Sequence, residues 1–150
     1  RDLHAHTPML TFMATINDLE EGTTQQLDFD KIAAIGRNGH QVIPVVLQDV
    51  DSGTVLFVGY ANEEALRMTL ELRSAVLYST SREEIWHKGA TSGDTLDLID
   101  VRVNCEQNSL LYRVRLAGTG ACHTRDQSGS TRGCCYYREL TSGTTLAFVD

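Results

Sequence analysis

The sequence predicts a strand-dominated α+β fold in a single domain with one main helix, and three features carry this prediction. Residues 41–50 and 54–61 are rich in β-branched and aromatic side chains and flank the turn sequence DSG, so we expect them to form a hairpin. Residues 94–105 and 109–118 alternate apolar and polar side chains around a polar turn, which is typical of a second hairpin with one buried face. Between the two hairpins, residues 63–73 have the composition of a helix.

The main helix is expected to begin after Asn62, because an asparagine side chain can accept a hydrogen bond from a free backbone N–H at a helix start. Arg73 suits the negative end of the helix dipole. The inner side of the helix is expected to carry Leu66, Thr69 and Leu70.

Three shorter elements complete the predicted domain. A short helix near residues 27–39 would present one apolar face, and residues 74–80 and 82–89 read as short strands. The apolar face of the short helix would carry Leu27, Phe29, Ile32 and Ile35.

The N-terminal segment differs in composition from the rest of the chain. We interpret residues 1–26 as a flexible lead-in and residues 27–150 as the ordered domain. The absence of an initial Met leaves open a vector-derived origin for residues 1–12, with Met13 as the natural start.

Length, hydropathy and charge restrict the class of partner. A chain of 150 residues is long enough to bury a core without disulfides. Its apolar runs are too short to cross a bilayer and no secretory signal is recognisable, so we expect a cytoplasmic protein without a membrane partner. The net charge of −7 and scattered basic residues argue against nucleic acid and favour a small-molecule substrate.

Four cysteines, of which three fall between residues 122 and 135, need a chemical role in a reducing compartment. There they are ligands, catalysts or packed small hydrophobes more often than disulfides. Neighbouring side chains in a strand point to opposite faces, so only one of Cys134 and Cys135 can readily face Cys122. Three converging thiolates would make an open zinc site, and the alternative is a set of buried, unreactive cysteines.

Several longer motifs occur in an order that resembles one enzyme family. From about Leu27 to Arg138, the chain carries VIPVVLQDVDSGTVLFVGYANEEAL, YSTSREEIWHKGATSG, NCEQNSLLYRV, ACHT and CCYYR. Their order and approximate spacing are similar to those of phosphoribosyl-AMP cyclohydrolases, hydrolases of histidine biosynthesis. The resemblance implies hydrolytic opening of the adenine ring of phosphoribosyl-AMP between N1 and C6, giving formimino-aminoimidazole-carboxamide ribotide. It also implies a homodimer with active sites at the subunit interface.

The resemblance implies a zinc site made of three cysteines, one donated by the opposite subunit. The matching residues are Cys105, Cys122 and Cys135, with Cys105 donated across the interface; Cys134 falls where the family has serine. Zinc would supply activated water for attack on an electron-poor ring carbon. His123 matches the family's catalytic histidine, and an imidazole is a side chain suited to proton relay, although the residue could instead only orient a ligand. His87 falls on a variable position and is expected to be solvated.

Two motifs of the resemblance supply groups for a substrate that carries two phosphates. Hydroxyls, cations and small residues that let backbone N–H groups approach an anion are all present. Trp86 could stack on a base, or simply belong to the core. The expected substrate-binding residues are Ser79, Ser81, Arg82, Trp86, Lys88, Gly89, Thr91, Ser92 and Gly93.

The chain departs from the family pattern at two places. Where the family has three aspartates proposed to hold magnesium, this chain has Asn104, Glu106 and Asn108, so we expect magnesium to bind weakly or not at all. The loop at residues 125–133 is longer than the family's usual connection. These departures leave two alternatives: a paralogue that hydrolyses another cyclic amidine or purine-like nucleotide, and a structural zinc protein with Cys134 or His123 as fourth ligand.

Overall fold

The computed structural model describes residues 18–150, which fall into two compact units. The larger unit comprises Asp30–Tyr136, and the smaller one combines the described residues up to Phe29 with Tyr137–Asp150. The predictions for residues 1–12 and for Met13 lie outside the described residues.

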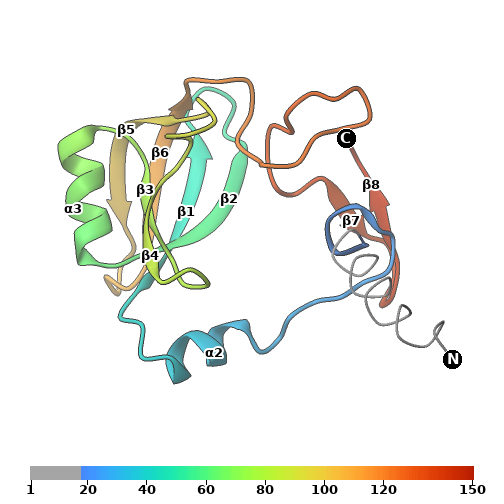
Figure 1. Ribbon diagram of the computed structural model, residues 1–150, viewed down its shortest axis with the longest axis horizontal. Helices are drawn as coiled ribbons and strands as arrows, with labels where there is room; N and C mark the ends of the chain where they lie inside the picture. Colours follow the sequence, from blue (N-terminus) through green and yellow to red (C-terminus); the bar gives the residue numbers. More distant parts are fainter. Residues whose placement is uncertain (1–17) are drawn as a thin grey trace, which may run out of the picture. The chain divides into compact units, whose positions relative to one another are not determined.

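A four-stranded sheet forms the centre of the larger unit (Figure 1). Its strands are β1 (Ile43–Asp49), β2 (Val55–Ala61), β5 (Leu96–Val103) and β6 (Leu110–Leu116), in the order β2-β1-β6-β5. The pairs β1–β2 and β5–β6 are antiparallel, which confirms both predicted hairpins, and β1 pairs with β6 in parallel. The sheet thus joins the two hairpins along strands that are far apart in the chain.

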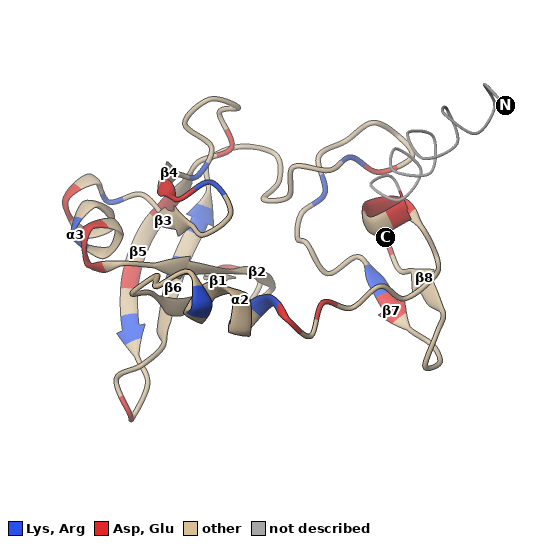
Figure 2. Cartoon of the chain, turned by 60° about the horizontal axis from the view of Figure 1, so that its bottom comes forward, with Lys and Arg blue, Asp and Glu red and all other residues tan. Residues whose placement is uncertain are grey.

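One face of this sheet is covered by a third hairpin and by the main helix. Strands β3 (Val76–Ser79) and β4 (Glu84–His87) pair antiparallel, and they lie with helix α3 (Glu63–Leu72) over the sheet (Figures 1 and 2). The core lies between these layers and includes Val45, Leu47, Leu77, Leu96, Tyr112 and Val114.

Helix α3 begins as predicted but turns a different face inward. Asn62 Oδ1 accepts the Ala65 N–H at 2.9 Å, which confirms the cap. Ala65 and Thr69 are the buried residues, one helical turn apart, whereas Leu70 is 48% exposed. Leu66 packs against the core as predicted. The prediction of Leu70 as an inner residue is wrong, because the buried face runs through Ala65 and Thr69 and Leu70 is turned away from it.

The short helix α2 spans only Lys31–Arg37 and buries only Ile35. Leu27 and Phe29 precede the helix, so they do not share its face, and Phe29 is 90% exposed. The predicted apolar face with Leu27, Phe29 and Ile32 is wrong for these three exposed residues.

The smaller unit is held by a hairpin of β7 (Arg138–Leu140) and β8 (Leu146–Phe148). The backbone N–H of Leu146 donates to Thr23 O at 2.7 Å, and that of Gln25 donates to Thr144 O at 2.8 Å. The sequence predicts a lead-in that ends at residue 26, whereas these bonds join its described part to the C-terminal segment.

Charged residues of both signs are distributed over the elements of the chain (Figure 2), which carries a net charge of −7. Across residues 18–150, no helix is both long and apolar enough to span a membrane.

Candidate active site

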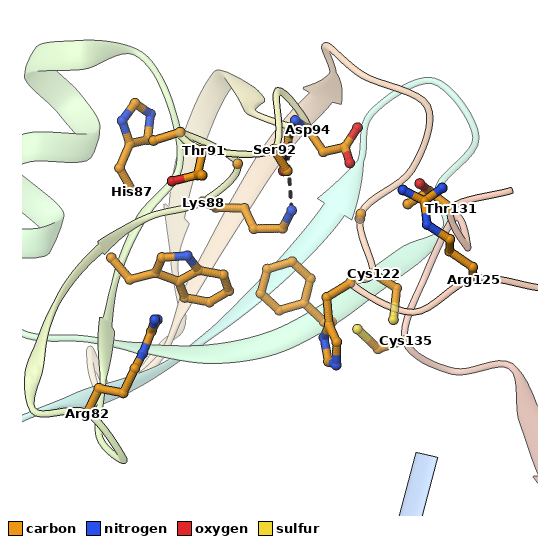
Figure 3. Close-up of a pocket in the computed structure, with 16 residues that line it drawn as sticks. Arg82, His87, Lys88, Thr91, Ser92, Asp94, Cys122, Arg125, Thr131 and Cys135 are labelled. Carbon is orange, nitrogen blue, oxygen red and sulfur yellow. Dashed lines mark hydrogen bonds between the residues drawn. The ribbon is translucent and has the colours of Figure 1, made fainter. Parts of the chain in front are cut away.

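A pocket of about 410 Å³ lies in the larger unit, between the end of strand β4 and the segment that carries the clustered cysteines (Figure 3). The turn after β4 forms one wall, with Lys88, Thr91, Ser92 and Asp94. The segment from Ala121 to Cys135 supplies the opposite wall. Two motifs about 30 residues apart in the chain therefore face one cavity.

Lys88 is a buried cation in the first wall. Only 7% of the residue is exposed, and its Nζ donates to Asp94 O at 3.1 Å. Burial lowers the pKa of Lys88, while the nearby carboxylate of Asp94 acts in the opposite direction. In Figure 3 the lysine points into the space between the two walls.

Gly89 allows the turn after Lys88 to close tightly. Its φ is +78°, and a Cβ placed there would collide with the backbone of Asp94 and Thr95. The turn is closed by a bond from Gly93 N to Gly89 O at 2.8 Å. A glycine is required here for both conformation and space.

We expect Gly89→Ala to lower the free energy of unfolding by about 3–5 kcal/mol, the combined cost of left-handed strain and a backbone collision. Gly93→Ala is the matched control, because Gly93 also has a positive φ but nothing lies within 4 Å of its Cβ position. It should cost only about 1–2 kcal/mol. Urea unfolding measures both variants, and equal losses would contradict the role of the collision.

Cys122 and Cys135 face each other in the pocket (Figure 3). Cys122 is 4% exposed, and the backbone N–H of Cys135 donates to Leu56 O at 2.8 Å, which ties this residue to strand β2. Although the Cys135 residue is partly solvent-accessible, its thiol lies inside the pocket. Burial raises the pKa of Cys135 to about 12, with a further contribution from Cys122, which hydrogen-bonds to it.

Cys134 packs against the hydrophobic core and does not line the pocket. Neither cysteine lies in a strand, because β7 begins only at Arg138, yet the two neighbouring side chains point to different surroundings. Cys105 lies in the exposed turn between β5 and β6, outside the pocket of its own chain. Within residues 18–150 of one chain, no three His, Cys, Asp or Glu side chains converge on a point that could hold a metal.

The turn around Cys105 is closed by the side-chain amides of Asn104 and Asn108. Asn104 Oδ1 accepts the N–H groups of Asn108 and Ser109, both at 2.9 Å. Asn104 Nδ2 donates to Asn108 Oδ1 at 2.7 Å, and Asn108 Nδ2 reaches Glu106 Oε2 at 3.4 Å. The side chains of Asn104, Glu106 and Asn108 therefore bond to the turn and to one another.

Most of the predicted substrate-binding residues come together, but three do not. Those that line the pocket are Arg82, Trp86, Lys88, Gly89, Thr91 and Ser92, together with His123. Ser79, Ser81 and Gly93 lie outside its lining. Ser79 Oγ accepts bonds from the backbone N and the Nε of Arg82 at 3.2 and 3.3 Å, so it orders that arginine.

Sequence reasoning missed several residues of the pocket. His87 was expected to be solvated, but it is half-buried, lies 2.8 Å from Ser74 Oγ and lines the cavity. The pairing of β3 with β4 draws it inward, and no local pattern signals this. The other missed lining residues are Phe57, Ala90, Asp94, Ala121, Arg125 and Thr131.

Arg125 and Thr131 come from the loop at residues 125–133. They form an isolated β-bridge with each other, and Arg125 Nη1 donates to Gly129 O at 3.0 Å. The carboxylate of Asp126 accepts bonds from Ser128 and Ser130, and these bonds lower its pKa. The loop is therefore internally braced and contributes to the pocket wall.

Facing thiols, a histidine, a buried lysine and hydroxyl groups in one cavity define a site for chemistry on a small polar molecule, so the fold and the pocket are those of an enzyme. A family model described as phosphoribosyl-AMP cyclohydrolase matches residues 57–137. The chain belongs to the phosphoribosyl-AMP cyclohydrolase family, as the sequence motifs predict, and the protein is thereby a hydrolase.

Individual relatives extend the match over most of the chain. The phosphoribosyl-AMP cyclohydrolase of Haloarcula marismortui is 48% identical over 104 residues, which cover 69% of this chain and 81% of the relative. That of Chlorobium chlorochromatii is 38% identical over 135 residues, 90% of each chain. The histidine biosynthesis bifunctional protein HisIE of Aquifex aeolicus is 41% identical over 103 residues, 69% of this chain and 47% of the relative.

Proposed function

We propose that this protein catalyses the zinc-dependent hydrolysis of phosphoribosyl-AMP, opening the adenine ring between N1 and C6 to give formimino-aminoimidazole-carboxamide ribotide. One observation carries the proposal: a single pocket gathers Cys122, His123 and Cys135 with the Trp86–Ser92 run. A thiol pair suited to a metal thus faces the groups suited to a phosphorylated nucleotide.

The donor set of the pocket fits zinc. Thiolates are soft ligands, and zinc binds them in sites that keep one position open for chemistry. Cys122 and Cys135 would hold the metal from one chain, with Cys105 of the partner subunit as the third ligand. The metal would supply Lewis-acid activation of the attacking water. A homodimer is therefore part of the proposal, because Cys105 lies outside the pocket of its own chain.

His123 would move the proton that ring opening requires. Imidazole exchanges protons near neutral pH, so it can accept one from the attacking water and return it to the departing ring nitrogen. The residue lines the same pocket as Cys122, which precedes it in the chain.

Trp86 is positioned to form an apolar wall of the pocket. The centroid of its ring lies 6.2 Å from that of Phe57, and the guanidinium of Arg82 lies 5.9 Å from the centroid of the tryptophan ring.

The substrate's phosphates would be received by local cations within an acidic protein. Arg82, Lys88 and Arg125 line the pocket, against one lining carboxylate, Asp94. Figure 3 shows the two arginines on opposite sides of the drawn pocket, which suits a molecule with a phosphate at each end. The hydroxyls of Thr91 and Ser92 add donors beside Lys88.

A spectrophotometric assay with phosphoribosyl-AMP tests the proposal directly. Purified protein loaded with zinc should convert the substrate, and removal of zinc with a chelator should stop turnover until zinc is restored. A zinc-loaded protein that leaves phosphoribosyl-AMP unchanged but opens another purine-like nucleotide would identify it as a paralogue.

The paralogue alternative has specific support, because the longer loop places Arg125 and Thr131 in the pocket wall and could alter which substrate fits. A structural zinc site closed by Cys134 has less support, since this side chain packs against the core. Parallel assays with AMP and with other nucleotides carrying a cyclic amidine distinguish a phosphoribosyl-AMP cyclohydrolase from a paralogue with another substrate.

Turnover is expected to depend little on magnesium at sub-millimolar levels. Asn104 and Asn108 replace carboxylates with neutral amides that bond to each other, and hard divalent cations prefer anionic oxygens. The double variant Asn104→Asp/Asn108→Asp should create or sharpen a magnesium dependence in the same assay, and Glu106→Gln should impair turnover. Tight magnesium dependence of the wild type that survives changes at all three positions would place the second metal elsewhere.

A further inference from the structure

A row of three buried polar groups runs behind the pocket, from Arg132 through Thr124 to Cys122. Arg132 Nη1 donates to Thr124 Oγ1 at 3.1 Å, and Thr124 Oγ1 lies 3.0 Å from Cys122 Sγ. The backbone N–H of Thr124 also donates to this sulfur at 3.5 Å. The three residues are 6%, 9% and 4% exposed, respectively.

Burial of the Arg132 guanidinium needs an explanation, because removing a charged group from water is costly unless it is well partnered. Arg132 follows the internally braced loop, and its backbone bonds to the segment that carries Cys122. Its carbonyl accepts the N–H groups of Ala121 and Cys122 at 3.2 and 3.1 Å, and its own N–H donates to Thr124 O at 3.1 Å. The same short stretch of backbone thus holds both ends of the row in place.

The direction of each hydrogen bond in this row follows from the chemistry of the three residues. A guanidinium can only donate hydrogen bonds, so the hydroxyl oxygen of Thr124 is the acceptor of the bond from Arg132. A cysteine that ligates a metal carries no proton, so the threonine hydroxyl must then donate to it. Cys122 would receive two hydrogen bonds from Thr124, one from the hydroxyl and one from the backbone.

We infer that Arg132 and Thr124 are positioning residues for Cys122: the guanidinium orients the threonine hydroxyl, and the hydroxyl holds the sulfur in the direction in which it binds zinc. This inference rests on the proposed function. The inference gives Arg132, in the last part of the 125–133 loop, a role of its own. The residue would hold the Cys122 thiol in place, in addition to the contribution that Arg125 and Thr131 make to the pocket wall.

Zinc affinity tests the inference without reference to turnover. The dissociation constant for zinc is measured by competition with a chromophoric chelator in the full-length protein and in Thr124→Val, Thr124→Ser and Arg132→Met. Loss of a hydrogen-bond partner of a metal ligand typically weakens affinity about 10–100-fold, which we expect for Thr124→Val and Arg132→Met. Thr124→Ser keeps the hydroxyl and should stay within about threefold of the wild type.

Because Arg132 is inferred to act through Thr124, its effect should vanish once the hydroxyl is gone. Arg132→Met in the Thr124→Val background should weaken zinc binding by less than about twofold, a non-additivity that a loop anchor would not produce. Thr141→Val and Arg115→Met are matched controls at exposed positions outside the pocket, and both should bind zinc like the wild type. If Arg132→Met does not fold, the comparison of Thr124→Val with Thr124→Ser still decides whether the Thr124 hydroxyl supports zinc binding by Cys122.

The possible failures are distinguishable. Wild-type affinity in Thr124→Val, or equal losses in Thr124→Val and Thr124→Ser, would overturn the positioning role while the zinc enzyme stands. A wild-type protein that binds no zinc would overturn the proposed metal site, and this inference with it.

Discussion

Cys135→Ser is expected to abolish zinc binding and turnover, whereas Cys134→Ser should retain both. Cys135 lines the pocket opposite Cys122, and Cys134 packs against the core. Loss of a ligand should weaken zinc affinity by more than about 100-fold, beyond the effect of residues that only support a ligand. Elemental analysis should find about one zinc per chain in the wild type and in Cys134→Ser, and almost none in Cys135→Ser.

The adjacent pair is its own control, because both substitutions replace sulfur with oxygen at neighbouring positions. Cys134→Ser could lower the melting temperature through its contact with the core, so stability is measured alongside the metal content. Zinc loss to the same extent in both variants would show that the assignment of Cys135, rather than Cys134, as the ligand is wrong.

Mixing two inactive variants, Cys105→Ser and Cys122→Ser, is expected to restore roughly a quarter of the wild-type activity. In the proposed homodimer each site combines Cys122 and Cys135 of one chain with Cys105 of its partner subunit. Random reassortment makes half of the dimers mixed, and each mixed dimer has one complete site of two. Activity is measured after mild dissociation and reassociation of equal amounts of the two proteins.

A mixture of Cys122→Ser with Cys135→Ser is the negative control, since both variants damage the thiol pair held within one chain and no combination rebuilds it. Subunit exchange is verified with two tags of different mass. Absence of recovery despite verified exchange would contradict a site shared between subunits.

The local elements of the fold were predictable because their signals lie within a few residues. The asparagine cap of α3 and the hairpins β1–β2 and β5–β6 formed where the sequence patterns place them. Backbone capping and alternation act over one turn or one strand pair, so they are readable from the chain alone. The exposed Leu70 shows the limit of such local prediction, because which face of a helix is buried depends on the elements that it packs against.

The candidate site was predictable where motifs carry the chemistry and unpredictable where packing supplies it. The motifs placed Lys88, Cys122 and His123 in one site, and the structure brings them to one cavity. His87 and Asp94 were missed because a hairpin and a turn, rather than a recognisable pattern, bring them there. Arg125 was missed because no motif marks it, and it reaches the pocket only through the folding of the loop at residues 125–133.

The sequence by itself determined the family and the secondary structure of the central elements. Only the tertiary structure decided that β1 pairs in parallel with β6, which joins two hairpins more than 30 residues apart. It also decided that Thr24 pairs with Thr145, and that Arg132 is buried against Thr124 behind Cys122. Local patterns reflect interactions between near neighbours in the chain, whereas these contacts depend on burial and hydrogen bonding between distant segments, which become defined only when the whole chain packs.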